Sequence, residues 1–148
     1  MLTRLVYHSE NHLGVTGGTM IADLNTILDA SNRNNEKAGI TGALLFDTLW
    51  FVQILEGERE AISATLCRII GDQRHDRVTV MDCRPATARL FANWWMGLAL
   101  LRGDQSALLS RHGLTSFNPR EMSGDQALSL ALDVAAGGLN RKVTAAAA

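Results

Sequence analysis

Short apolar segments of two kinds alternate along the first hundred residues of this chain, and their order leaves few possible folds. Segments in which apolar and polar side chains alternate indicate strands, and segments with apolar residues three or four positions apart indicate helices. The predicted strands are 2–9, 40–47, 51–56, 77–83 and 93–101, and the predicted helices are 19–38 and 58–70. This β-α-β-β-α-β order with one further strand predicts an α+β, ferredoxin-like sheet with both helices packed on one face.

Polar residues and glycines mark the ends of the predicted elements. Thr19 is a candidate N-cap of the first helix, and Gly39 and Gly71 are candidate C-terminal stops of the two helices. The connection "DTLW" (47–50) between the two hairpin strands lacks the usual glycine or Asn-Gly, which leaves its turn geometry poorly specified. We predict that the second helix buries one apolar face, formed by Ile62, Leu66, Ile69 and Ile70.

The pattern changes beyond about residue 103, where strand-like alternation stops. Ser123 and Gln126 have the spacing of a capping box and precede an apolar helical run. A chain of 148 residues suits one domain with a short addition. We therefore predict one domain at residues 1–102 and a C-terminal helical extension at residues 103–148.

Composition excludes several classes of partner and location. The 14 basic and 15 acidic residues give a formal charge of −1, which provides no bulk attraction to nucleic acid or to an anionic membrane. The longest apolar run, "WWMGLALL" (94–101), is far shorter than the roughly 18 residues needed to cross a bilayer. Two cysteines without a CxxC motif or a secretory leader predict a cytoplasmic protein, with Cys67 a structural thiol.

Four hydrogen-bonding side chains fall on the predicted buried side of the sheet and the first helix. Gln53 shares its strand face with Phe51 and Leu55, and Tyr7 lies on the covered face of the first strand. Ser31 and Asn35 continue the inward stripe of the first helix after its leucines. A buried carboxamide without partners costs about 2–7 kcal/mol on transfer from water. These four side chains therefore either bond to one another in a polar core or bind a flat, neutral, hydrogen-bonding ligand.

Five sequence blocks in this order resemble the BLUF family, the blue-light receptors that use flavin. The blocks are "LVYHS" (5–9), "SNRNNEKAGITGALLF" (31–46), "FVQILEG" (51–57), "DQRHDRV" (72–78) and "FANWWMG" (91–97). The resemblance implies a flavin between the two helices, with FAD the usual form and FMN or riboflavin left open. It also implies a photoreceptor rather than an enzyme.

The resemblance assigns roles to individual residues. Tyr7 becomes the redox partner of the excited flavin, and Gln53 the amide that links the Tyr7 hydroxyl to the ring. Gln53 is expected to rotate or tautomerise, which shifts the absorption to the red. The implied flavin contacts are Tyr7, Ile27, Ser31, Asn34, Asn35, Phe51, Gln53, Ile69, Asp72, Arg74, His75 and Met96.

The resemblance also implies a route for the signal. Trp94 and Met96 on the predicted fifth strand are the expected relay, although either of them, or the additional Trp95, could face the flavin. No output domain follows in the sequence, so we expect a short stand-alone receptor that acts on a separate effector protein and forms a homo-oligomer. Phe46, in place of a common tyrosine, and the "DTLW" turn depart from the family pattern without touching the expected flavin site.

Two other functions remain possible from the residues themselves. A small ferredoxin-like hydrolase acting on acyl phosphates would use Arg74 and an asparagine to hold its substrate, and it would be colourless. An interaction module whose polar core bonds only to itself would have neither colour nor turnover. The spacing of His8 and His12 and the glycine loop "GVTGGT" are weak motifs, and solvated histidines and a plain loop are the simpler interpretations.

Overall fold

A five-stranded sheet forms the centre of the molecule in the computed structural model, which describes residues 1–13 and 17–143, without the side chains of residues 17–19. The strands run in the spatial order β4-β1-β3-β2-β5, with β2 and β5 parallel and the other neighbours antiparallel. The elements are β1 (Leu2–Asn11), α1 (Gly17–Ala38), β2 (Thr41–Phe46), β3 (Trp50–Glu58), α2 (Arg59–Ile70), β4 (His75–Pro85), β5 (Gly97–Leu100), α3 (Ser106–Ser110), η1 (Pro119–Glu121) and α4 (Gly124–Ala136).

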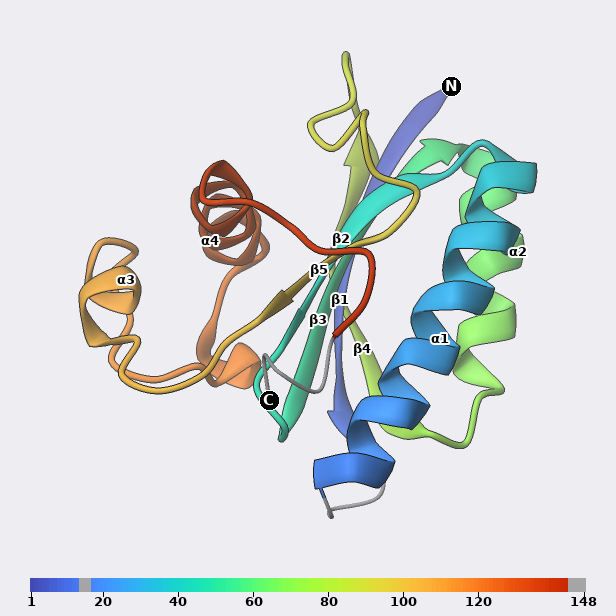
Figure 1. The fold of residues 1–148 in the computed structure, drawn as a ribbon. Helices are drawn as coiled ribbons and strands as arrows, with labels where there is room; N and C mark the ends of the chain where they lie inside the picture. The colour runs from blue at the N-terminus through green and yellow to red at the C-terminus, as the bar shows by residue number, and fades with distance from the viewer. Residues whose placement is uncertain (14–16, 144–148) are drawn as a thin grey trace.

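The two faces of the sheet are covered by different parts of the chain. Helices α1 and α2 lie on one face, and α3 and α4 lie across the other (Figure 1). Alternation along β1 places Leu5 and Tyr7 in the core under α1 and α2, and Val6 in the core under the C-terminal helices. The predicted ferredoxin-like fold with two helices on one face is thus confirmed, and the C-terminal helices are present.

The C-terminal helices form a second covering layer of the sheet. Leu130 and Ala131 of α4 are fully buried in a core that also contains Val6 of β1 and Ile54 of β3. The capping box predicted for α4 is present, with the Ser123 hydroxyl accepting from the backbone of the third helical residue. Helix α4 begins at the expected place for this reason.

Four local predictions were wrong or incomplete. His8, expected to be solvated, is 7% exposed and meets the Trp50 ring edge-on. Ile70 is 59% exposed, because the buried side of α2 is centred on Ile62 and Thr65, and Ile70 lies about 80° around the helix from Ile62. The predicted strand at 93–101 is shorter, since β5 begins only at Gly97. Helix α1 begins at Gly17, two residues before the predicted cap Thr19, whose side chain lies outside the described part of the structure.

The connection between β2 and β3 closes without a glycine. Asp47 accepts hydrogen bonds from the backbone N–H groups of Leu49 and Trp50, and Thr48 takes the left-handed conformation at φ 85°. An aspartate that bonds to the backbone two residues ahead forms an Asx-turn, which substitutes for the missing glycine.

Tight packing at Gly42 fixes the β2–β3 pair in register. A Cβ atom on Gly42 would lie 1.9 Å from the carbonyl oxygen of Ile54, so only glycine fits at this position. Register then pairs Leu44 with Gln53, and on the other side β1 pairs Tyr7 with the same glutamine. Gln53 therefore lies at the middle of the sheet, on the face covered by α1 and α2.

A buried carboxylate holds the connection that leads to β5. Glu56 is fully buried and accepts from the backbone N–H groups of Leu90 and Phe91 and from the Arg4 guanidinium. Arg89 donates to the carbonyl oxygens of Glu56 and Gly39, which ties the same connection to the end of α1.

Within the described residues, no helix is long and apolar enough to cross a membrane.

Candidate functional site

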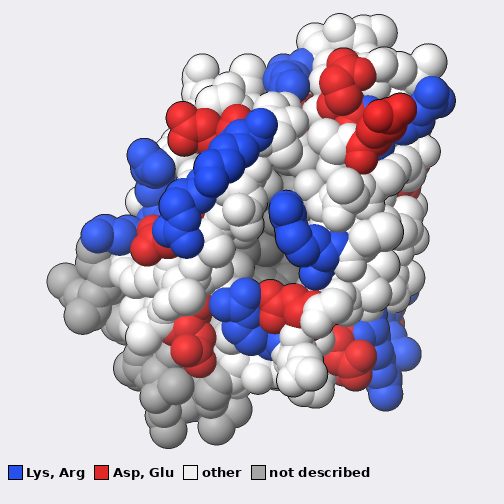
Figure 2. Space-filling view, turned by 90° about the vertical axis from the view of Figure 1, so that its right-hand side faces the viewer, with Lys and Arg blue, Asp and Glu red and all other residues white. Residues whose placement is uncertain are grey.

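A cavity of about 280 Å³ opens between α1, α2 and the sheet. This volume is close to the lower end of the range of about 300–1,000 Å³ typical of small-molecule pockets. Figure 2 shows the hollow on the face of the molecule that carries these helices, with basic and acidic side chains at its rim. The cavity is the place where the polar residues of the two helices and the sheet meet.

Eleven of the twelve predicted binding residues line this cavity, and Met96 is the exception. The lining ones are Tyr7, Ile27, Ser31, Asn34, Asn35, Phe51, Gln53, Ile69, Asp72, Arg74 and His75. They come from β1, α1, β3, α2, the connection after α2 and the first residue of β4. The structure thus brings together side chains that are up to 68 residues apart, from Tyr7 to His75.

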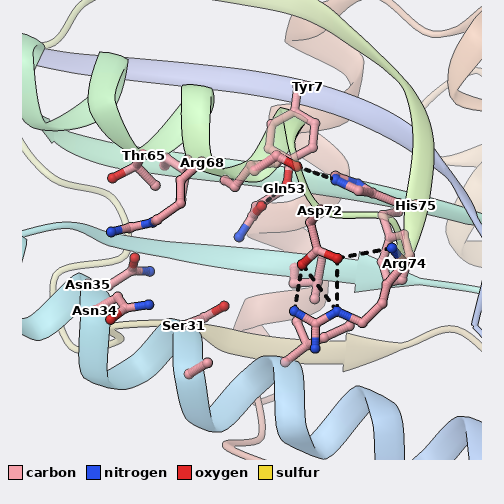
Figure 3. A pocket seen from close by; sticks show the side chains of 16 residues that line it. Tyr7, Ser31, Asn34, Asn35, Gln53, Thr65, Arg68, Asp72, Arg74 and His75 are labelled. Atoms are coloured by element: carbon pink, nitrogen blue, oxygen red, sulfur yellow. Dashed lines mark hydrogen bonds and ion pairs between the residues drawn. The ribbon is translucent and has the colours of Figure 1, made fainter.

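Tyr7 and Gln53 form a hydrogen-bonded pair at the floor of the cavity. The Tyr7 hydroxyl donates to Gln53 Oε1, and the two residues lie opposite each other on β1 and β3 (Figure 3). Both side chains are buried, with exposed fractions of 3% for Tyr7 and 6% for Gln53. Burial raises the pKa of the Tyr7 hydroxyl, and the negative charge of Asp72 raises it further. Tyr7 is therefore a neutral hydrogen-bond donor at physiological pH.

The amide nitrogen of Gln53 faces away from Tyr7, toward the start of β5. Gln53 Nε2 lies 3.4 Å from Met96 Sδ, a weak acceptor, and Met96 is fully buried behind the cavity wall. Trp94 packs instead with the core on the opposite face of the sheet, and Trp95 is 37% exposed. Of the three candidates, Met96 is therefore the side chain next to Gln53.

Helix α1 supplies amide groups to one side of the cavity. Asn35 is 3% exposed and donates from Nδ2 to the carbonyl oxygen of Trp95 at 2.7 Å, so its Oδ1 remains as an acceptor for the cavity. Asn34, one position earlier, is exposed at the cavity mouth, and Ser31 is half-buried one turn before Asn35 (Figure 3). The three side chains offer both donors and acceptors to a ligand edge.

The connection after α2 places a compact ion pair at the rim. The Arg74 guanidinium donates to Asp72 through Nε at 2.9 Å and Nη2 at 2.5 Å, and the Arg74 backbone N–H donates to the same carboxylate at 2.9 Å. The hydrogen bond from Arg74 holds the pKa of Asp72 below its usual range. The pair thus keeps its charges without drawing a proton from Tyr7.

His75 closes the end of the cavity between Tyr7 and Phe51. Its Nε2 lies 2.7 Å from the carbonyl oxygen of Ile69, which can only accept, so Nε2 donates. Its Nδ1 lies 2.7 Å from Ser9 Oγ and accepts from that hydroxyl in the neutral ring. The ring meets Tyr7 edge-on at 6.5 Å and Phe51 at 6.3 Å between centroids.

Sequence reasoning missed five lining residues: Ala30, Leu44, Leu55, Thr65 and Arg68. Leu44 and Leu55 could have been found from the strand register, since they flank Gln53 on its own face. Thr65 and Arg68 lie on the same side of α2 as Ile69, but their polarity hid them from a search for apolar stripes.

Within the described residues, no group of three or more His, Cys, Asp or Glu side chains could hold a metal ion.

The donor set of the cavity suits a planar heteroaromatic ligand. Ile27 of α1 and Ile69 of α2 provide apolar walls, while Gln53 and the asparagines provide amides at the edge. Among the described lining residues, the one carboxylate, that of Asp72, is paired with Arg74, so it does not oppose an anionic or electron-rich ring.

Comparison with known proteins points to one class of ligand. A family model described as "Sensors of blue-light using FAD" (BLUF) matches residues 2–97. The blue light- and temperature-regulated antirepressor BluF of Escherichia coli is 32% identical over 102 residues, which are 69% of this chain and 24% of that protein. This chain therefore spans about a quarter of the length of that relative.

Two solved structures cover nearly the whole chain. The photo-activated state of BlsA has a TM-score of 0.80 at 25% identity and covers 90% of this chain and 94% of that one. The dark state of BlrB, a BLUF protein, has a TM-score of 0.75 at 31% identity and covers 93% of this chain and 97% of that one. The likeness to both extends beyond residue 97, into the C-terminal helices.

Proposed function

Because the chain belongs to the BLUF family of blue-light sensors that use FAD, we propose that it is a photoreceptor whose response depends on Tyr7 and Gln53. The observation that carries this proposal is their direct hydrogen bond at the buried floor of the cavity. Membership of the family makes the chain a blue-light sensor, and we propose the roles of its individual residues below.

The flavin ring would lie between α1 and α2, with its edge toward Gln53. Ile27 and Ile69 would contact its two faces, and Asn35 Oδ1 would accept from a ring N–H, since Asn35 Nδ2 is already engaged with Trp95. Arg68 and Arg74 at the rim would bind the phosphate of the side chain of FMN or FAD. We propose FAD as the bound form on the family description, because the ring contacts are common to all flavins.

Tyr7 would act as the reversible donor of one electron and one proton. A bound flavin would supply the oxidant for this transfer when it is excited by blue light. The hydrogen bond to Gln53 would be the route by which the buried Tyr7 hydroxyl releases its proton. The raised pKa of Tyr7 keeps the proton on the oxygen in darkness.

Gln53 would store the result of this transfer as a changed hydrogen-bond pattern. In this structure its Oε1 accepts from Tyr7 and its Nε2 faces Met96, which would be the arrangement in darkness. Rotation or tautomerisation would exchange donor and acceptor positions toward Tyr7, toward the ring edge and toward Met96. A stronger hydrogen bond to the ring carbonyl explains a small red shift of the absorption.

The output would leave through the start of β5. Met96 contacts Gln53 directly and would be the first residue of the relay, and Trp94 lies on the opposite sheet face, where it packs in the core that includes the C-terminal helices. We propose that residues 1–102 are the photosensory unit and residues 103–148 the extension that presents its state to a separate effector protein. We further propose that the protein forms a homo-oligomer, lies in the cytoplasm and has no enzymatic activity.

An absorption spectrum of the purified protein in darkness and after blue light tests this function. We expect a structured flavin band that moves reversibly to the red. A flavin-loaded protein whose spectrum does not respond to light would contradict the proposal, and so would a protein that cannot be loaded with flavin.

A further inference from the structure

The last described residues of the chain return to the sheet and hold β5 from its outer side. Residues 139–143, here called the C-terminal strap, pass from α4 along the edge of β5 toward α1 (Figure 1). The Leu98 N–H donates to the Asn140 carbonyl at 2.7 Å, and the Asn140 N–H donates back to Leu98 at 2.9 Å. Asn25 of α1 then donates to the Val143 carbonyl and accepts from the Val143 N–H, both at 2.7 Å.

Two side chains of the C-terminal strap anchor it in both cores of the protein. Leu139 is 7% exposed and packs in the core beneath α4, whereas Val143 is 6% exposed and packs in the core beneath α1. Leu139 lies so close to Gly97 that a Cβ atom there would be 2.5 Å from Leu139 Cδ1. The strap therefore crosses the edge of the sheet and contacts β5, α1 and the C-terminal core at once.

Strand β5 is the least supported strand of the sheet. It has four residues and pairs with β2 on one side, while a single bridge to the strap holds its outer side. Its first residue, Gly97, directly follows Met96, whose sulfur lies against the Gln53 amide. Three steps thus connect the cavity to the strap: Gln53 to Met96, Met96 to Leu98 along the backbone, and Leu98 to Asn140.

We propose that the C-terminal strap is a latch that is closed in darkness and opens when Gln53 changes its hydrogen bonds. This inference rests on the proposed function, because it takes the change at Gln53 as its cause. A glutamine that turns its oxygen toward Met96 loses the contact of Nε2 with Sδ and places two acceptors together. The backbone of Met96 and Leu98 then moves relative to α1, and the strap cannot keep its bonds to both elements.

Opening would expose a defined surface. The N–H and C=O groups of Leu98 would lose their partners at the sheet edge, and such an edge accepts an extended peptide segment as an added strand. The latch would thereby act as an intramolecular competitor for an extended segment of the effector protein.

Two experiments test the latch by measuring the hydrogen exchange of single amides with NMR, one in darkness and one under light. The dark arm compares Asn25→Ala with Thr26→Ala, a matched control on the same helix whose hydroxyl donates to the Ala22 carbonyl within α1. Asn25→Ala removes both bonds to Val143. We expect exchange at Asn140 and Val143 to rise at least about fivefold, as loss of one ordinary hydrogen bond implies, with no change in Thr26→Ala.

The light arm uses the flavin-loaded protein under continuous blue light. We expect the same amides to exchange at least about fivefold faster than in darkness, while those of Val6 and Ile54 in the sheet centre stay unchanged. A red-shifted protein with unchanged exchange at Asn140 and Val143 would overturn the latch and leave the proposed function intact. Absence of any red shift would overturn both. Unchanged exchange in Asn25→Ala would overturn the latch without any reference to light.

Discussion

Replacement of Gln53 by leucine tests the central pair of the site in both stability and photochemistry. Leucine has a similar volume but cannot accept from the Tyr7 hydroxyl, which in the described part of the protein bonds to Gln53. Tyr7 is 3% exposed, so its hydroxyl is largely shielded from bulk water. A buried donor left without a partner costs about 1–3 kcal/mol. We therefore expect Gln53→Leu to lower the free energy of unfolding by roughly this amount.

A double-mutant cycle separates this penalty from ordinary repacking. Tyr7→Phe removes the donor, so Tyr7→Phe combined with Gln53→Leu leaves no unpaired group and should be less destabilised than the sum of the single variants by about 1–2 kcal/mol. Urea unfolding of the four flavin-free proteins gives these values. Thr65→Val is the control partner, because Thr65 is buried in the cavity wall and makes no hydrogen bond to Tyr7. Its cycle with Tyr7→Phe should be additive.

The same Gln53→Leu variant has a photochemical outcome. We expect it to bind flavin and to lose the light-induced red shift, because leucine has no donor and acceptor to exchange. A normal red shift in this variant would refute the role of Gln53. Strict additivity in the Tyr7 and Gln53 cycle would refute the buried hydrogen bond itself.

Three further predictions concern other parts of the site and the fold. Tyr7→Phe should keep bound flavin but lose the red-shifted state, and a light-minus-dark spectrum like that of the wild type would contradict its role as donor. Glu56→Ala should lower the free energy of unfolding by about 3–5 kcal/mol, measured in urea, because it leaves buried partners uncompensated, whereas replacement of the exposed Glu58 by alanine should have a much smaller effect. The pKa of Asp72 is lowered from 3.8 in the folded protein by Arg74, so its stabilisation is present above this value and is lost as the pH falls through the folded pKa. The advantage in thermal midpoint of the wild type over Asp72→Asn should therefore shrink between pH 6 and pH 3, and an advantage that grows toward low pH would contradict the ion pair.

Strand alternation made the core of the site predictable from the sequence. A glutamine between Phe51 and Leu55 has to point to the same side as they do, and Tyr7 follows the same rule on β1. The helical stripe that ends at the buried Asn35 predicted the wall of the cavity opposite the sheet. The strand and helix periods, together with the polarity of these side chains, were sufficient to predict the site, because a buried amide needs a hydrogen-bond partner wherever it lies.

Other features depend on contacts between distant segments and could not be predicted in this way. Residues 94–96 begin an apolar run that was predicted as a strand, yet the carbonyl of Trp95 is bonded by the Asn35 side chain rather than by a neighbouring strand. Nothing in the local pattern of Asn25 indicated its bonds to Val143, which lies 118 residues away. Burial of α4 on the far side of the sheet was also hidden, because an amphipathic pattern gives a helix a buried face but not the surface it packs against.

The position of the C-terminal layer has a consequence for synthesis of the protein on the ribosome. Strand β3 is complete at Glu58, but the apolar face formed by Val6, Val52 and Ile54 is covered only when α4 has left the ribosome, near residue 136. At a synthesis rate of about 5–20 residues per second, that apolar face stays uncovered for on the order of ten seconds. The nascent chain is a candidate client for chaperones during this interval, and truncation before α4 should cause aggregation rather than yield a smaller soluble receptor.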